Sequence, residues 1–344
     1  MRIALISPPW VPVPPPAYGG TEAVLDTLAR GLSRAGHEVL LYATGDSTCP
    51  VTREWYYEHA VGVGVAGAAS ELCHVVHAYE KVRGFDVVHD HTLVGPVYAQ
   101  RYPDLPVVTT NHGPFDGELG HLYRAIAHQV PVIAISHNQA SAARGFRIAA
   151  VIHHGLDLDT FPVGAGTGGY AMFLGRMNPE KGAHVAARVA LAAGIPLLIA
   201  AKMREPAEHA YYDKWVRPLL GGTVEYVGEV GRAEKLSLLS GATCLLNPIS
   251  WREPFGLVMV EALACGTPVV ATPCGAAPEI VEVGRTGFLA SDDAGLIAAI
   301  RKVGDLDRRA CRESVQTRFS AARMVAEHVR LYEQSSVRRP IRAA

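Results

Sequence analysis

Short apolar runs that alternate with amphipathic helical patterns are the feature of this sequence that most constrains its fold. The runs Arg2–Ser7, Glu38–Ala43 and Pro106–Thr110 show almost no alternation of polar and apolar residues, and helical patterns such as Thr21–Ala35 lie between such runs. Strands of this kind are buried on both faces, which is typical of parallel sheets covered by helices. The sequence therefore predicts an α/β fold.

Residues 156–169 interrupt this rhythm, because they form an irregular loop that ends in four closely spaced glycines. The alternation restarts with a strand at Tyr170–Leu174 and continues to a strand at Pro268–Ala271. Three helical stretches then close the chain, the last around Ala321–Gln334. Residues 44–69 show no clear pattern. Glycine clusters mark loops, so the interruption is best explained as a linker between two domains.

This division gives two doubly wound, Rossmann-like domains of similar size, residues 1–155 and 170–320, joined by the linker 156–169. Ligands bind at the carboxyl ends of the strands in such sheets. Two domains that face each other would place a ligand in a central cleft between them.

Composition excludes several function classes. The 344 residues carry 32 Lys and Arg against 33 Asp and Glu, so there is no basic excess to bind a nucleic acid through its phosphates. No apolar run reaches the roughly 18–20 residues that span a bilayer. The six cysteines form no Cys-x-x-Cys pair, which is typical of reduced thiols. We therefore expect a cytoplasmic protein with no structural zinc.

The segment 247–268 holds the strongest motif. Glu253 precedes a predicted helix and Glu261 lies inside it, eight residues further on. That spacing leaves the two carboxylates about 80° apart around the helix axis, so both can face one cleft wall. A carboxylate in an apolar helix needs a partner. The alternative is structural, with Glu253 capping the helix and Glu261 held in an ion pair.

A second candidate follows the first strand of the second domain. Arg176 and Lys181 lie in the stretch Gly175–Gly182, which opens the next helix. Cations at a strand's carboxyl end and at a helix N-terminus suit a phosphate group. The spacing is not that of a Walker A loop. The alternative is a pair of solvated charges in an ordinary loop.

The first domain offers weaker signals. Gly19 and Gly20 stand just before a helix, where backbone amides can approach an anion. His112 follows a strand and should face the cleft. His89-Asp90-His91 ends another strand, and a metal site there would need a third ligand. Asp157-Leu158-Asp159 could hold a metal in a metal-dependent nucleotide-sugar enzyme, but the same pattern recurs at 305–307 and is common by chance.

Taken together, these motifs resemble those of the family 4 retaining glycosyltransferases, which have the GT-B fold. The Glu253 to Glu261 segment matches the family's Glu-x7-Glu signature, and the Arg176 to Lys181 segment matches its Gly-Arg…Lys-Gly stretch. His154-Gly155-Leu156-Asp157 is similar to the family's linker pattern, with His154 in place of the usual Asn. That match assigns Asp157 and Asp159 to the linker rather than to a metal.

The resemblance implies roles for the matching residues. Arg176 and Lys181 would hold the donor diphosphate, Glu253 the sugar hydroxyls and Glu261 the ribose. The helix at 321–344 would cross back to the first domain. The implied catalytic set is His112, Glu253, Arg176 and Lys181. The implied donor-binding set is Gly19, Gly20, Arg176, Lys181, Gly228, Glu229, Val230, Glu253, Phe255, Gly256, Leu257 and Glu261.

The function that follows is transfer of a sugar, with retention at the anomeric carbon, from a nucleoside-diphosphate donor to an acceptor hydroxyl. UDP is favoured over GDP by family frequency, and we expect no metal and no cofactor. The acceptor would be a sugar, a glycolipid or a natural product. If it is a glycolipid, the protein would contact the membrane surface peripherally. The 26 Arg against 6 Lys indicate a high-GC bacterial genome, which suits antibiotic or glycoconjugate biosynthesis. A sugar-nucleotide epimerase and a non-catalytic sugar-nucleotide binder are the alternatives.

Overall fold

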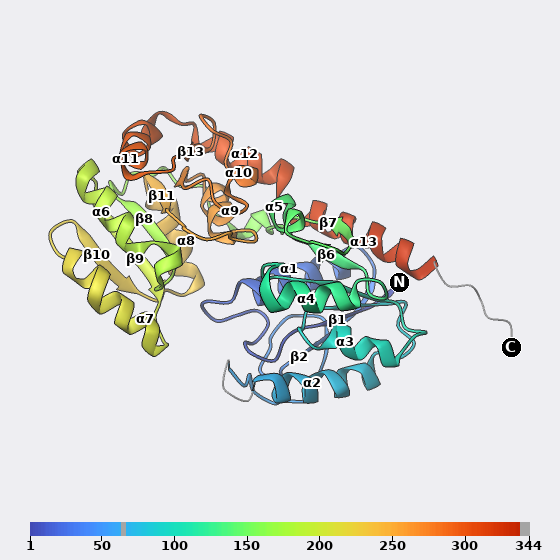
Figure 1. Cartoon of the computed structure of the whole chain (residues 1–344). Coiled ribbons are helices and arrows are strands. Elements are labelled where there is room, and N and C mark those ends of the chain that lie inside the picture. Colours follow the sequence, from blue (N-terminus) through green and yellow to red (C-terminus); the bar gives the residue numbers. More distant parts are fainter. Residues whose placement is uncertain (63–66, 338–344) are drawn as a thin grey trace, which may run out of the picture. The chain divides into compact units, whose positions relative to one another are not determined.

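The chain folds into two α/β units, which we describe separately. The computed structural model describes residues 1–62 and 67–337. The first unit comprises Met1–Gly155 together with the C-terminal segment from Ala321, and the second comprises Leu156–Ser320 (Figure 1). Each unit has one parallel sheet with helices on both faces, so the predicted pair of doubly wound domains is confirmed.

The first unit contains a seven-stranded parallel sheet in the order β3-β2-β1-β4-β5-β6-β7. The direction of the strand order reverses between β1 and β4, which is the point where doubly wound sheets bind ligands. Its strands are β1 (Arg2–Ile6), β2 (Glu38–Ala43), β3 (Thr52–Trp55), β4 (Val87–Asp90), β5 (Val107–Thr110), β6 (Val132–Ala134) and β7 (Ile148–Val151). Its helices are α1 (Gly20–Arg34), α2 (Gly67–Lys81), α3 (Gly95–Tyr98), α4 (Gly117–Ile126), α5 (His137–Ser141) and α13 (Ala321–Val337).

Part of the region without a clear pattern, 44–69, forms the edge strand β3. Its sequence Thr-Arg-Glu-Trp is partly exposed, which explains why it lacked the apolar signature of the other strands. Residues 63–66 of that region lie outside the described residues, and so do residues 338–344 of the predicted C-terminal segment. Within the described part, α13 packs against α1, β4 and β5 of the first unit.

The second unit contains a six-stranded parallel sheet in the order β10-β9-β8-β11-β12-β13. Its strands are β8 (Ala171–Arg176), β9 (Leu197–Lys202), β10 (Val224–Gly228), β11 (Cys244–Asn247), β12 (Val269–Ala271) and β13 (Gly287–Leu289). Its helices are α6 (Ala183–Ala193), α7 (Pro206–Tyr211), α8 (Arg232–Gly241), α9 (Leu257–Ala264), α10 (Ala277–Ile280), α11 (Asp293–Lys302) and α12 (Arg308–Arg318).

The prediction that only helices follow β12 was wrong. The strand β13 joins the edge of the sheet and pairs with β12 from Gly287 to Leu289. Three residues are too few to show a strand pattern, and the glycine adds no apolar side chain. The helical segment between β9 and β10 consists of α7, a π-helical turn at Tyr212–Val216 and a 3₁₀ turn at Arg217–Leu219.

The glycine-rich end of the segment 156–169 packs tightly within the second unit. The amides of Gly164, Gly166 and Gly168 donate to the carbonyls of Cys265, Ser240 and Gly241 at 3.0, 3.2 and 2.9 Å. A Cβ atom on Gly164 would lie 2.1 Å from the carbonyl oxygen of Ser240. These glycines therefore serve close packing of the backbone rather than flexibility.

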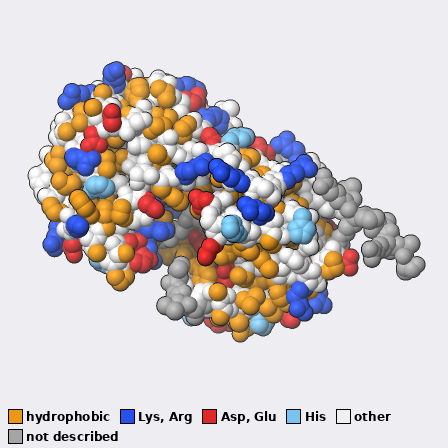
Figure 2. All heavy atoms as spheres, in the orientation of Figure 1, with side chains coloured by type: hydrophobic (Ala, Val, Ile, Leu, Met, Phe, Trp, Pro, Cys, Tyr) orange, Lys and Arg blue, Asp and Glu red, His pale blue; other side chains and the backbone are white. Residues whose placement is uncertain are grey.

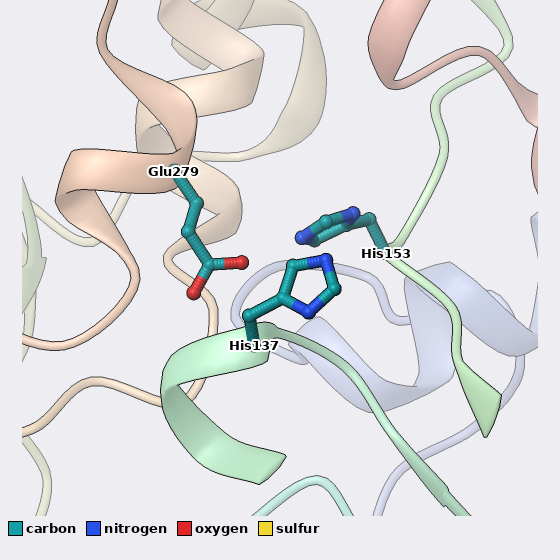
Figure 3. Close-up of side chains that lie close together, drawn as sticks. All are labelled: His137, His153 and Glu279. Atoms are coloured by element: carbon teal, nitrogen blue, oxygen red, sulfur yellow. The ribbon is translucent and has the colours of Figure 1, made fainter. Parts of the chain in front are cut away.

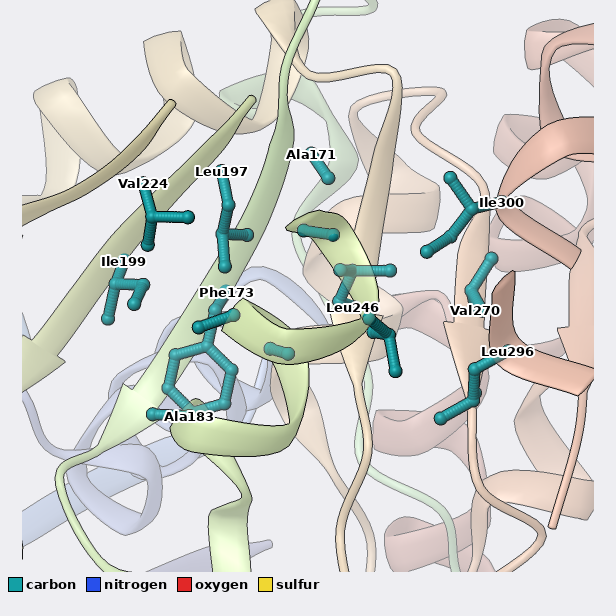
Figure 4. Packing of buried hydrophobic residues seen from close by; sticks show 14 of the residues in the cluster. Ala171, Phe173, Ala183, Leu197, Ile199, Val224, Leu246, Val270, Leu296 and Ile300 are labelled. Carbon is teal, nitrogen blue, oxygen red and sulfur yellow. The ribbon is translucent and has the colours of Figure 1, made fainter. Parts of the chain in front are cut away.

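The core of the second unit explains why its strands read as apolar runs. Phe173, Ile199, Leu246 and Val270 come from four neighbouring strands and pack under α6 and α11 (Figure 4). Each of these four side chains is almost completely buried. Burial on both sheet faces thus fixes the carboxyl ends of these strands, from which the site residues extend.

The surface of each unit mixes charges of both signs. Figure 2 shows Lys and Arg side chains interspersed with Asp and Glu side chains on the face drawn. None of the helices in residues 1–62 and 67–337 is both long and apolar enough to cross a membrane.

Candidate active site

The loop between β11 and α9 places Glu253 in a polar contact network. Glu253 Oε2 forms an ion pair with Lys181 Nζ and accepts a hydrogen bond from Trp251 Nε1 at 2.8 Å. The ammonium group of Lys181 also lies 5.2 Å from the centre of the Trp251 ring. Lys181 and Glu253 are mostly buried, with side-chain exposures of 18% and 14%. The two residues that the sequence assigned to phosphate and sugar are therefore in direct contact.

The start of α9 is shaped by Gly256. This residue caps the helix with φ of 99°, a left-handed conformation that side chains disfavour. Phe255 is buried and packs edge-to-face on Phe319 at 5.9 Å, while Leu257 is the first helical residue. Backbone amides at such a helix start have no intrahelical partner and carry partial positive charge. The predicted trio Phe255, Gly256 and Leu257 therefore lies where an anion would be stabilised.

Arg176 is the last residue of β8 and lies close to the carboxylate of Glu208. Its Nε lies 3.8 Å from Glu208 Oε1, and Glu208 also lies 3.3 Å from Lys202 Nζ. Arg176 pairs with Lys202 in the register of β8 and β9. The carboxyl end of these two strands thus carries two cations with Glu208 between them.

Glu261 lies in the middle of α9 and is buried. Its Oε1 accepts a hydrogen bond from Lys235 Nζ of α8 at 2.6 Å, with side-chain exposures of 10% and 20%. The need for a partner was clear from the sequence, but its identity was not, because α8 and α9 meet only through tertiary packing. Lys235 is therefore a partner of a predicted site residue that the motifs did not reveal.

The predicted donor-binding residues Gly228, Glu229 and Val230 lie at the end of β10. Gly228 ends the strand with φ of 88°, and Val230 is buried. The carboxylate of Glu229 accepts two hydrogen bonds from the Arg204 guanidinium, at 3.0 and 2.7 Å. The Glu229 carboxylate is thus held in an ion pair with Arg204.

The predicted donor residues of the second unit gather at one edge of its sheet. They extend from the carboxyl ends of β8, β10 and β11 and from the starts of α6 and α9. Gly19, Gly20 and His112 belong to the first unit, which is described by itself. The edge in the second unit combines cations, carboxylates and helix N-termini, a composition suited to a sugar phosphate.

In the first unit, Gly19 and Gly20 form the transition into α1. Gly20 is the first helical residue, and Gly19 stands immediately before it. Glu22 in the first turn is buried, and burial raises its pKa to about 7, although its own backbone amide lowers it. The N-terminus of α1 therefore carries a carboxyl group that takes up a proton close to neutral pH.

His112 follows β5 and is part of a buried histidine cluster. Its Nε2 forms a hydrogen bond with Nδ1 of His91 at 2.9 Å. Its ring also stacks on His154 at 5.3 Å between centroids. Burial, with a smaller effect of His328, lowers the pKa of His112 to about 4. At neutral pH the imidazole is uncharged, so it acts through one N–H and one lone pair.

His137 and His153 lie near this cluster in the sequence but form a separate pair. The His137 ring, at the start of α5, meets the His153 ring after β7 edge-to-face, 5.6 Å between centroids (Figure 3). Figure 3 also draws Glu279, which lies on α10 of the second unit. Neither histidine belongs to the predicted site.

Two family models match the two units. Residues 168–305 match the model of the glycosyl transferases group 1, and residues 18–160 match that of glycosyltransferase family 4. Together the matches extend over most of both units and include every predicted site residue.

Curated relatives match along nearly the whole chain. A glycogen synthase of Mycobacterium tuberculosis is 30% identical in a match that covers 89% of this chain and 86% of the relative. A phosphatidyl-myo-inositol mannosyltransferase of Mycobacterium leprae is 29% identical in a match that covers 98% of this chain and 94% of that protein.

Solved structures share the architecture. A glycosyltransferase involved in avilamycin A biosynthesis superposes with a TM-score of 0.74 at 27% identity, and covers 98% of both chains. The HepE protein of Anabaena, in complex with UDP and glucose, gives a TM-score of 0.78 at 20% identity, over 97% of this chain and 99% of that one. The second likeness concerns the fold alone.

Proposed function

Because the chain belongs to the family 4 glycosyltransferases and has their GT-B fold, we propose that it transfers a sugar from UDP to an acceptor hydroxyl with retention of anomeric configuration. GDP is the competing nucleotide. UDP is preferred because it is the more frequent donor nucleotide in the family.

The Lys181–Glu253 ion pair is the observation that carries the proposal. A mostly buried ammonium needs an anionic partner, and Glu253 fills that place in the structure. A donor diphosphate offers more negative charge than one carboxylate, so it can replace Glu253 as the ionic partner of Lys181. Trp251 Nε1 would still hold Glu253, whose freed carboxylate oxygens could accept hydrogen bonds from sugar hydroxyls.

The leaving diphosphate needs its developing charge offset. Arg176, Lys181 and the amides at the start of α9 supply two full positive charges and roughly half of another. Groups fixed by the fold need little reorganisation as the charge develops. We propose that this set makes a divalent metal unnecessary.

The transfer balances without a protein nucleophile. The acceptor oxygen bonds to the anomeric carbon while the bond from that carbon to the diphosphate oxygen breaks. The proton of the acceptor hydroxyl passes to the departing phosphate, and positive charge on the sugar ring is transient. His112 would contribute a hydrogen bond at the reacting sugar rather than a charge.

The nucleotide is tested by thermal shift with UDP and GDP. A ligand at one hundred times its dissociation constant adds about 2.7 kcal/mol to the free energy of unfolding. We expect UDP to give the larger increase in melting temperature. The variant Glu261→Gln should reduce that increase, whereas Arg301→Gln, on the exposed part of α11, should leave it unchanged. No shift with either nucleotide would contradict the assignment.

Transfer is tested with UDP-glucose, with and without excess chelator, against a panel containing a free saccharide, a glycolipid and a natural product. We expect an acceptor-dependent product with retained configuration and the same rate in chelator. Donor conversion without acceptor would favour an epimerase. Activity that requires manganese would contradict the proposed role of Arg176 and Lys181.

A further inference from the structure

We propose that His91 is a positioning residue for His112: it donates its Nδ1–H to Nε2 of His112 and thereby keeps the single ring proton of His112 on Nδ1. The tautomer follows from the structure alone. Its catalytic consequence rests on the function proposed above, in which His112 meets the reacting sugar.

The histidines of the first unit form a continuous stack of rings. His89 lies 3.9 Å from His91, His91 lies 5.2 Å from His112, and His112 lies 5.3 Å from His154, between ring centroids. His328 of α13 lies 5.2 Å from His89 at the far end. The rings come from the ends of β4, β5 and β7 and from α13, so the fold rather than the local sequence assembles them.

Within this stack, the hydrogen bonds of His89 and those of the His91–His112 pair involve different partners. His89 is bonded through both ring nitrogens, to the Tyr332 hydroxyl at 2.6 Å and to the Thr110 hydroxyl at 2.8 Å. His91 and His112 are bonded to each other. His89 therefore ties β4 to β5 and α13, whereas the state of His112 is set by His91.

Both members of the His91–His112 pair are neutral at pH 7. Burial and the neighbouring histidines hold the pKa of His91 well below its usual range, and burial lowers that of His112 to about 4. Two neutral imidazoles share one hydrogen bond in only two ways. Either His91 donates and His112 accepts, or the roles are reversed.

The second nitrogen of His91 decides between them. His91 Nε2 is buried and has no hydrogen-bond partner among the described residues. If His91 accepted from His112, its own proton would lie on Nε2 as a buried, unpaired N–H. Orphaned buried N–H groups are rarer in proteins than unsatisfied acceptors. The arrangement in which His91 donates leaves only a lone pair unsatisfied, so Nδ1–H of His91 is the donor.

This arrangement fixes what His112 can offer a ligand. Its Nε2 is occupied by His91, and its remaining nitrogen, Nδ1, carries the proton. His112 is then a hydrogen-bond donor to an oxygen of the sugar or of the leaving phosphate. It is not a base for the acceptor hydroxyl, which agrees with a proton that departs with the diphosphate. Such control of one ring nitrogen through the other is a general property of histidine.

The tautomer is measured directly by ¹⁵N NMR of the histidine rings in the full-length, ligand-free protein. The His112 signals are assigned by their loss in His112→Gln and those of His91 by their loss in His91→Asn. We expect a protonated Nδ1 and an unprotonated Nε2 for both rings at pH 7.5. A proton on Nε2 of His112 would overturn the proposal, whether or not transfer activity is found.

The catalytic consequence is tested with two substitutions of His91. The amide nitrogen of Asn can occupy the place of Nδ1, so His91→Asn should keep kcat within about threefold, whereas His91→Leu should lower kcat at least about tenfold with KM for UDP-glucose nearly unchanged. His74→Leu is the matched control. His74 is also buried with one unpartnered ring nitrogen, but its bonded nitrogen meets the Ser7 carbonyl.

The outcomes separate the two proposals. Equal kcat for His91→Leu and the wild type, with both folded, would overturn the positioning role. An equal loss of kcat in His74→Leu would also overturn it, because the effect would then be general destabilisation. If the wild type transfers no sugar while the NMR shows the predicted tautomer, the proposed function fails and the hydrogen-bond assignment stands.

Discussion

The two units bury polar groups in opposite ways. The interior of the first unit holds titratable groups whose charged forms are disfavoured by burial, namely six histidines with lowered pKa values and the carboxyls of Asp90, Glu22 and Glu71 with raised pKa values. The site edge of the second unit holds charged groups as pairs, such as Lys181 with Glu253 and Lys235 with Glu261.

The difference has a physical cause and a functional meaning. Histidine can enter a core by losing its proton, at a small cost near neutral pH, whereas lysine must keep a partner. Neutral rings hold a fixed hydrogen-bond geometry but offer a ligand little charge. Ion pairs can exchange one partner for an anionic ligand. The first unit is therefore suited to positioning and the second to binding charge.

The first prediction is that acid pH destabilises the first unit more than the second, and this is the largest difference that we expect between them. Each lowered histidine pKa makes the folded state bind fewer protons than the unfolded state, whose histidines titrate near 6.5. Stability is therefore full above pH 6.5 and falls toward pH 4, by up to about 1.4 kcal/mol per pH unit for each group. Asp90 and Glu22 act in the opposite direction. Because their pKa values are raised in the folded state, the stability that they contribute is lost as pH rises from about 4 to about 7.

Six histidines outweigh three carboxyls, those of Asp90, Glu22 and Glu71, so the first unit should lose protection first as pH falls. Hydrogen exchange with peptide resolution, from pH 7.5 to pH 5, measures both units in the intact chain. We expect faster exchange in β4 and β5 at pH 5 than at pH 7.5, after correction for intrinsic rates. Simultaneous loss in β8 and β11 would contradict the contrast between the units.

The second prediction tests whether a buried pair of the second unit serves binding. Lys181→Met should lower kcat/KM for the donor on the order of a hundredfold, because one preorganised cation is lost. Lys214→Met is the matched control, since Lys214 also lies over a tryptophan ring, at 5.1 Å, but outside the predicted site. Steady-state kinetics should show no change for the control. Equal effects would mean that the Lys181–Glu253 pair is only structural.

The contrast between the units is also the limit of what the sequence could reveal. Apolar runs predicted the parallel strands, because burial on both faces leaves a clear signature. The edge strands β3 and β13 were not predicted. In β3, Arg53 and Glu54 are partly exposed, and β13 has only three residues. The local pattern of apolar residues does not reveal a strand that contributes little to the core.

For the candidate site, too, the sequence revealed one part and not another. The positions of Glu253, Glu261, Arg176 and Lys181 follow from strand ends and helix starts, which the sequence shows. Their partners do not, because Lys235 reaches Glu261 only through the packing of α8 on α9. His89-x-His91 was read as a weak metal motif, and only the fold shows that each ring bonds a different neighbour.

The third prediction concerns the buried pair on α8 and α9. Glu261→Gln removes a charged acceptor, which is worth roughly 1.5–3 kcal/mol, so affinity for UDP should fall about tenfold or more. Lys235→Met leaves Glu261 without its partner and should lower stability in urea denaturation. The double variant should recover part of that stability, because no charge is then buried alone. Unchanged UDP affinity in Glu261→Gln, measured by calorimetry, would reject the ribose assignment.

The smallest expected effect compares one hydroxyl–imidazole bond in each unit. Tyr332 OH bonds His89 Nδ1 at 2.6 Å among fully buried groups, and Tyr211 OH bonds the partly exposed His184 Nδ1, also at 2.6 Å. Tyr332→Phe leaves His89 Nδ1 without a hydrogen-bond partner in a place that water cannot reach, which should lower the free energy of unfolding by about 1–2 kcal/mol. Tyr211→Phe should cost about half of that or less, because water can replace the lost partner at His184. Denaturant unfolding of both variants measures the difference. Equal losses would mean that burial of the histidine cluster adds nothing to the strength of its hydrogen bonds, and the contrast between the units would then rest on charge alone.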